Sequence, residues 1–179
     1  MNLLSIIKYP DPILKKVCPP VAKVTKEIQQ LLEDMTETMY AAPGVGLAAP
    51  QVGELKRVIV LDVSWSKEGG KKELYQLVNP KIIERSGEIE WEEGCLSILD
   101  FLQTMKRSQK VKVEALNKQG KLIVVEGEDL LAVCLQHEID HLDGKLFVDK
   151  TADEVQMKKI LEEAGFGNII SPASPIMIG

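Results

Sequence analysis

The sequence lacks a long apolar run and an excess of positive charge. Its longest apolar stretch near the start, LLSII at 3–7, is far shorter than the roughly 20 residues of a membrane-spanning helix. No basic leader precedes this stretch and no small-residue cleavage site follows it, so we expect no targeting segment and no membrane partner. The formal net charge of −5 gives no electrostatic reason for tight binding to nucleic acid. We therefore expect a cytoplasmic protein without a direct nucleic-acid site.

Cysteine is scarce and odd in number, with Cys18, Cys95 and Cys134 only. Without a secretory signal, three cysteines argue against a disulfide framework and favour reduced thiols. A lone cysteine is most often a small buried hydrophobic residue, and we interpret Cys18 and Cys134 in this way. Cys95 differs because Gly94 precedes it at the end of an expected strand, where the backbone can turn and bring a thiolate inward.

The pattern of apolar residues predicts one α+β domain over residues 1–179. Four prolines within 8–20 indicate an extended N-terminal arm. Helical spacing predicts helices over 25–42, 128–144 and 152–165, and the apolar segment 165–179 is expected to be a loose or docked tail.

Strands are expected between the first two helices. The β-branched run at 57–63 predicts a buried strand, and 74–94 predicts two or three strands broken at Asn79-Pro80 and at Gly87. The alternating segments 110–117 and 121–127 predict an antiparallel hairpin. The whole order indicates mainly antiparallel sheets around a central helix, with further helices near both ends of the chain.

Histidine is scarce, because the chain has only two and both lie in QHEIDH at 136–141. At positions i and i+4 of a helix, the rings of His137 and His141 project from one face and can bind one metal ion. Glu138 lies about 100 degrees round the helix, badly placed as a ligand but able to act on a metal-bound water. The alternative is that the two histidines are solvated on an amphipathic helix. The apolar residues beside them argue against this alternative, because they indicate a mostly buried helix. No third histidine remains, so Cys95 is the best further ligand.

The stretch GVGLAAPQVG at 44–53 contains a match to a dinucleotide-binding fingerprint. That fingerprint needs a strand before it and a long helix after it, whereas here a helix precedes and Pro50 follows closely. We therefore expect these glycines to let the backbone approach a bound peptide. Gln51 offers a side-chain amide that can donate to a developing oxyanion, although alone it would be an ordinary loop residue.

Three stretches taken together resemble a known family. GVGLAAPQVG at 44–53, EGCLS at 93–97 and QHEIDH at 136–141 are similar, in this order, to the three motifs of peptide deformylase, and YPDPIL at 9–14 resembles the start of that family. The resemblance extends from about Tyr9 to Asp149. It implies a hydrolase that removes the formyl group from N-formyl-methionyl peptides, with nascent chains at the ribosome as partners.

The resemblance also implies a role for each matching residue. The metal, natively ferrous iron and replaceable by nickel, cobalt or zinc, would be held by Cys95, His137 and His141. A metal-bound hydroxide would attack the formyl carbon, with Glu138 as general base and acid and with Gln51 and the Leu96 N–H as oxyanion donors. Gly46 would contact the substrate backbone. The methionine pocket would be lined by Val45, Val133, Cys134 and the ring of His137.

Two departures from the family pattern stand near Cys95. Leu99 takes the place of the usual proline, and the following DFLQTM at 100–105 is unusually apolar, so we expect an altered edge of the substrate cleft. We expect Arg107 to pair with Glu93 and brace the Cys95 loop. Asp140 is either an acceptor that orients a ligand imidazole or an exposed surface acid.

Two other functions fit part of this pattern. A metallopeptidase or amidase could use the same H-E-x-x-H arrangement and would cleave internal or unformylated peptide bonds. A non-catalytic metal-binding domain would need a fourth protein ligand that closes the site, and the sequence offers none near these motifs.

Overall fold

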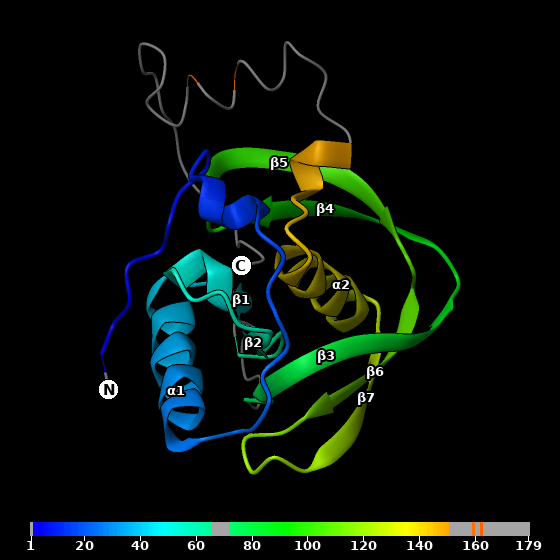
Figure 1. The fold of residues 1–179 in the computed structure, drawn as a ribbon. Coiled ribbons are helices and arrows are strands. Elements are labelled where there is room, and N and C mark those ends of the chain that lie inside the picture. The colour runs from blue at the N-terminus through cyan, green and yellow to red at the C-terminus, as the bar shows by residue number, and fades with distance from the viewer. Residues whose placement is uncertain (1, 66–71, 151–158, 160–161, 163–179) are drawn as a thin grey trace.

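The computed structural model describes residues 2–65, 72–150, 159 and 162 (Figure 1). The helix predicted over 152–165 lies outside the described residues, apart from positions 159 and 162, and so does the predicted tail over 165–179. Within the described part of the chain, no helix is both long and apolar enough to cross a membrane.

Two antiparallel sheets enclose one helix. The larger sheet has the order β1 (Gly46–Ala48), β2 (Val58–Leu61), β3 (Tyr75–Ser86), β6 (Lys110–Leu116) and β7 (Leu122–Glu128), and the smaller sheet pairs β4 (Ile89–Cys95) with β5 (Ile98–Arg107). Figure 1 shows α2 (Leu130–Leu142) between the two sheets and α1 (Lys26–Ala41) at one side. Short 3₁₀ helices span Pro12–Lys15, Ala49–Val52 and Phe147–Lys150. The predicted α+β class, central helix and β6–β7 hairpin are confirmed.

The two helices differ in how they are buried. α1 is amphipathic, and Leu32, Met35 and Met39 on its inner face are fully buried against the first two strands of the larger sheet. In α2 every residue over 132–139 is buried, since apolar positions face both sheets. Fully burying a Leu, Val or Ile side chain contributes about 1.5–3 kcal/mol, so this packing holds α2 firmly and carries its polar residues into the interior.

One predicted strand break is wrong. β3 continues through Asn79-Pro80, with a register shift between Val78 and Lys81 and a φ of 53° at Asn79. The Asn79 side chain accepts a 2.8 Å hydrogen bond from the Val21 N–H and donates one of 2.8 Å to the Val21 carbonyl. This distant partner stabilises a bulge where the local sequence indicates a break. The predicted break at Gly87 is confirmed, and the apolar stretch after Leu99 lies within β5.

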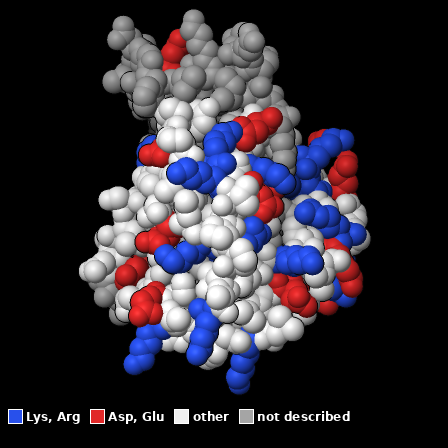
Figure 2. All heavy atoms as spheres, in the orientation of Figure 1, with Lys and Arg blue, Asp and Glu red and all other residues white. Residues whose placement is uncertain are grey.

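Charged side chains of both signs are interspersed over the face of the molecule shown in Figure 2. Several form cross-strand ion pairs on the outer side of the larger sheet, including Lys110 with Glu128 at 2.8 Å and Lys112 with Glu84 at 3.2 Å. Such exposed pairs contribute about 0–1 kcal/mol each. The fold is therefore held by its core and its buried polar contacts.

One buried carboxylate joins α1 to the segment after β2. Asp62 is fully buried and accepts hydrogen bonds from the Tyr40 hydroxyl at 2.9 Å, the Ser64 hydroxyl at 2.8 Å, and the N–H groups of Ser64, Trp65 and Glu73 at 3.0–3.1 Å. Burial alone would raise the pKa of Asp62. The hydrogen bonds from Ser64 and Tyr40 outweigh that effect and hold the pKa below the ordinary 3.8.

Replacing Asp62 with Asn tests this contribution, because it removes the charge and keeps the side-chain size. With a folded pKa below 3.8, the carboxylate stabilises the protein above that pH, and the contribution is lost as the pH falls through 3.8 towards the folded pKa. We expect Asp62→Asn to lower the free energy of unfolding at pH 7 by about 1–3 kcal/mol. Urea unfolding at pH 7, 5 and 3.5 should show the difference from wild type shrinking at the lowest pH. A constant difference would contradict this explanation.

Candidate metal centre

Three potential ligand side chains converge between α2 and the end of β4. His137 and His141 project from the same face of α2 with their ring centroids 4.9 Å apart, and Cys95 is the last residue of β4. One ligand atom from each of the three residues lies within 4.8 Å of the other two, and Cys95 Sγ is 3.4 Å from His141 Nε2. All three residues are buried. The structure thus brings together the three residues that the sequence nominates as ligands.

A buried carboxylate orients His137. Glu93 Oε2 lies 2.8 Å from His137 Nδ1, so the Nδ1–H donates to Glu93 and the Nε2 lone pair is left for another partner. Among the described residues, His137 Nε2 is buried and has no hydrogen-bond partner. This is the ring atom that a cation would coordinate.

Arg107 compensates the charge of Glu93. Its guanidinium donates to Glu93 Oε1 at 2.7 Å and to Glu93 Oε2 at 2.9 Å, which confirms the predicted pair, and a third bond reaches Asp140 Oδ2 at 2.6 Å. Burial would raise the pKa of Glu93, but the hydrogen bonds from Arg107 and His137 lower it to about 2. Glu93 is therefore ionised, and it is Glu93 that accepts from His137, whereas Asp140 accepts from Arg107.

The local electrostatics favour a bound cation. Burial raises the pKa of the Cys95 thiol to about 12, with the Ser97 N–H opposing part of the effect. Burial also raises the pKa of Glu138 well above its ordinary value, and the charge of Glu93 adds to this. A cation beside these groups favours their ionised forms and forces deprotonation of a coordinating thiol. A sulfur and two imidazoles suit a transition metal better than magnesium or calcium.

Glu138 lies directly behind the backbone of β1. Among the described residues, neither of its carboxylate oxygens has a hydrogen-bond partner, although the side chain is fully buried. A Cβ at Gly46 would lie 2.4 Å from Glu138 Oε1 and 2.9 Å from Cys134 Sγ, so only glycine fits there. From the sequence we expected the glycines to let the backbone approach a bound peptide. In the structure, the backbone at Gly46 packs closely against α2 of the same chain.

Gln51 presents its amide nitrogen to the Cys95 loop. Its carbonyl oxygen accepts a 2.9 Å bond from the Ala48 N–H, while Nε2 donates to Ser97 Oγ at 3.1 Å and lies 3.6 Å from Cys95 Sγ. Leu96, the other expected oxyanion donor, follows Cys95 directly. The sequence-based prediction assigned no role to Ser97. Its position two residues after Cys95 was the only indication in the sequence that it lies near the site.

The residues expected to hold a methionine side chain lie together. Val45, Val133 and Cys134 are buried in one core cluster, and Cys134 Sγ is 3.7 Å from the Val45 carbonyl oxygen. Cys18 and Cys134 are both buried, as interpreted from the sequence. The glycine-rich loop follows α1 and leads into a short 3₁₀ helix, which is not the strand–loop–helix of a dinucleotide site.

Replacing Arg107 with Ala tests the brace around Glu93. The variant leaves a buried carboxylate without its cation, which typically costs about 3–5 kcal/mol. We expect a lower urea midpoint and reduced metal retention after dialysis. Lys106→Ala is the matched control, because Lys106 is exposed on the same strand and pairs with the exposed acids Glu88 and Glu90. Wild-type stability and metal content in Arg107→Ala would show that Glu93 needs no brace.

Comparison with known proteins agrees with this geometry. The family model described as Polypeptide deformylase matches residues 3–157. A peptide deformylase of Alkalilimnicola ehrlichii is 48% identical over 160 residues, covering 89% of this chain and 88% of its own.

Solved structures of the same family resemble the fold. A peptide deformylase from Legionella pneumophila gives a TM-score of 0.84 at 43% identity, over 92% of this chain and 96% of its own. One from Ehrlichia chaffeensis, in complex with actinonin, gives 0.86 at 37% identity, over 94% and 99%. The chain therefore belongs to the polypeptide deformylase family, whose members are metal-dependent hydrolases that remove the formyl group from nascent peptides.

Proposed function

We propose that Cys95, His137 and His141 bind one divalent cation, beside which Glu138, Gln51 and Leu96 hydrolyse the formamide of N-formyl-methionyl peptides. The observation that carries this proposal is the convergence of the three ligand atoms within 4.8 Å, next to a buried Glu138. A catalytic site needs an open coordination position and a nearby acid–base group, and this donor set supplies three ligands with Glu138 alongside.

The cation we propose is ferrous iron, which nickel, cobalt or zinc can replace. A thiolate ligand favours a soft or borderline metal, and His137 Nε2, which has no hydrogen-bond partner among the described residues, is a suitable nitrogen donor. When bound, a divalent cation of this kind supplies hydroxide at neutral pH by lowering the pKa of water from 15.7 towards about 7.

The residues around the cation divide the remaining work. Glu138 takes the proton from the attacking water and later gives it to the peptide nitrogen. A C–O bond forms at the formyl carbon and the C–N bond breaks, which releases formate and a free N-terminal amine. During the attack, the Gln51 amide and the Leu96 N–H donate to the oxygen that becomes negatively charged.

The substrate is held through its backbone and its methionine side chain. β1 is an edge strand of the larger sheet, so an extended peptide can lie along it and contact the Gly46 backbone. We place the methionine side chain among Val45, Val133, Cys134 and the ring of His137, whose apolar surfaces suit an unbranched thioether.

In the cell, the proposed substrates are nascent chains leaving the ribosome in the cytoplasm, and residues 1–179 act as one catalytic domain. Formylated N-termini arise during protein synthesis, so the enzyme must act where these chains emerge. Actinonin, present in the Ehrlichia chaffeensis structure, is a suitable probe of the same site in this chain.

Replacing Glu138 with Gln is the direct test of the mechanism. The variant keeps the shape of the side chain and removes its proton transfer, so kcat for formate release from a short N-formyl-Met peptide should fall by about 10²–10⁴. Metal content should remain at the wild-type level. Glu92→Gln, an exposed acid on β4, is the control and should behave as wild type. Release of formate at the wild-type rate by Glu138→Gln would eliminate Glu138 as the acid–base group.

Metal analysis tests the proposed cation. Protein purified without oxygen should contain close to one iron per chain, and removing it with a chelator should abolish formate release until ferrous iron is returned. Cys95→Ser should bind the metal more weakly than wild type, because a hydroxyl is a poorer ligand for these metals than a thiolate. Cleavage of unformylated peptides by the loaded protein would instead indicate a metallopeptidase. A loaded, folded protein without any activity would indicate a structural metal site.

A further inference from the structure

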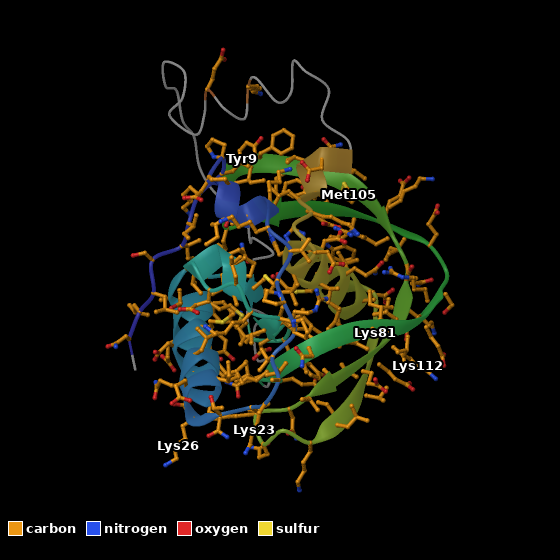
Figure 3. All side chains as sticks on the ribbon, in the orientation of Figure 1. Tyr9, Lys23, Lys26, Lys81, Met105 and Lys112 are labelled. Atoms are coloured by element: carbon orange, nitrogen blue, oxygen red, sulfur yellow. The ribbon has the colours of Figure 1, made fainter. Side chains whose placement is uncertain are left out.

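The N-terminal arm, residues 2–20, binds both segments that carry the proposed oxyanion donors. The Ile7 N–H donates to the Gln51 carbonyl at 2.8 Å, and the Tyr9 N–H donates to the Ser97 carbonyl at 2.8 Å. Between them, the Lys8 ammonium group donates to the Leu96 carbonyl. Figure 3 shows Tyr9 at the end of the molecule where the arm meets β5. Three consecutive residues of the arm thus join the Gln51 segment to the Leu96-Ser97 turn.

The arm holds the short turn that connects β4 to β5. Cys95 pairs with Ile98, so Leu96 and Ser97 are the two central residues of the turn. Both of their carbonyls are bound by the arm, one through the backbone of Tyr9 and one through the side chain of Lys8. The Leu96 N–H lies in the peptide plane that precedes the Leu96 carbonyl, and only the φ and ψ rotations of Leu96 separate the two planes. Because Cys95 pairs with Ile98 on one side of the turn and the arm holds the carbonyls on the other, these rotations are restricted and the direction of the Leu96 N–H is limited.

Lys8 differs from its neighbours because its contact depends on the side chain. The bonds from Ile7 and Tyr9 come from backbone N–H groups, which most other residues would also supply. The side chain of Lys8 is exposed overall, yet burial of its ammonium end lowers the pKa, and the nearby Cys95 opposes that shift. The contact with the Leu96 carbonyl therefore depends on the identity of residue 8, whereas the two backbone bonds do not.

We propose that Lys8 is a positioning residue, which holds the Leu96 carbonyl so that the Leu96 N–H keeps the direction needed to stabilise the oxyanion. This inference rests on the proposed deformylase mechanism and extends it to a residue outside the three motifs. The contact of Lys8 is with a backbone carbonyl and not with a group to which we assign a step of the reaction. Its effect should therefore appear in kcat and should be smaller than that of removing an oxyanion donor itself.

Kinetics of matched variants test this role. Lys8→Met removes the charge and the donor, Lys8→Arg keeps both, and Lys16→Met removes the same charge at an exposed position of the same arm. In formate-release assays with ferrous-loaded protein, kcat of Lys8→Met should be about tenfold lower than that of wild type. This decrease is smaller than the decrease of about 10²–10³-fold expected when an oxyanion donor is lost outright. KM and metal content should stay within about twofold of wild type, because substrate binding and the ligands are untouched. Lys8→Arg should recover most of kcat, and Lys16→Met should equal wild type.

Hydrogen exchange of the Leu96 and Ser97 amides tests the same contact without an activity assay. Exchange in a peptide spanning 93–98 should be faster in Lys8→Met than in wild type and unchanged in Lys16→Met. Wild-type kcat or wild-type exchange in Lys8→Met would overturn the proposal. Loss of activity only in proportion to lost metal or lost folded protein would also overturn it, by making Lys8 merely structural. If wild-type protein released no formate, the mechanism would fail, and exchange would still decide whether Lys8 holds the turn.

Discussion

The hydrogen bond between Glu93 and His137 is the contact on which the centre depends. It fixes which nitrogen of His137 carries the proton, and it places a negative charge inside the core. Such a charge is tolerated only when it is paired and fully hydrogen-bonded, and Arg107 meets that requirement with two bonds. Since Glu93 is on β4, Arg107 on β5 and His137 on α2, one ionic network ties the small sheet to the central helix.

The unusual burial of α2 follows from the same arrangement. A helix between two sheets can be apolar on every side, and its few polar residues must then find partners in the interior. Gln136 does so by accepting from Arg85 at 2.9 Å and donating to the Ser108 carbonyl at 2.8 Å. Among the described residues, the Glu138 carboxylate has no such partner. A buried acid without a partner is typical of a catalytic group.

The sequence predicted most of the centre because its strongest signals are local. The spacing of His137 and His141 depends only on helical geometry. The roles of Cys95, Gln51 and Leu96 came from the resemblance of three short motifs to a known family. The pair of Arg107 with Glu93 was a hypothesis about opposite charges near Cys95, which the structure confirms. Features that depend on distant partners were missed. The bulge in β3 is stabilised by Val21, far away in the chain, and the role of Glu93 as acceptor for His137 needs two elements to meet. The contacts of the arm with Gln51 and Ser97 likewise join segments that no short window of sequence connects.

Within the described part of the chain, the smaller sheet shares no strand pairing with the larger one. Its contribution to the proposed ligand set is Cys95, whereas both histidines belong to α2. A cation shared among them would therefore act as a further crosslink between the β4–β5 hairpin and α2, beside the hydrogen bond between His137 and Glu93. The metal would then stabilise the structure in addition to its part in the reaction. Without the metal, the β4–β5 hairpin would open locally more often. Each opening would expose the uncoordinated thiol of Cys95 to oxidants.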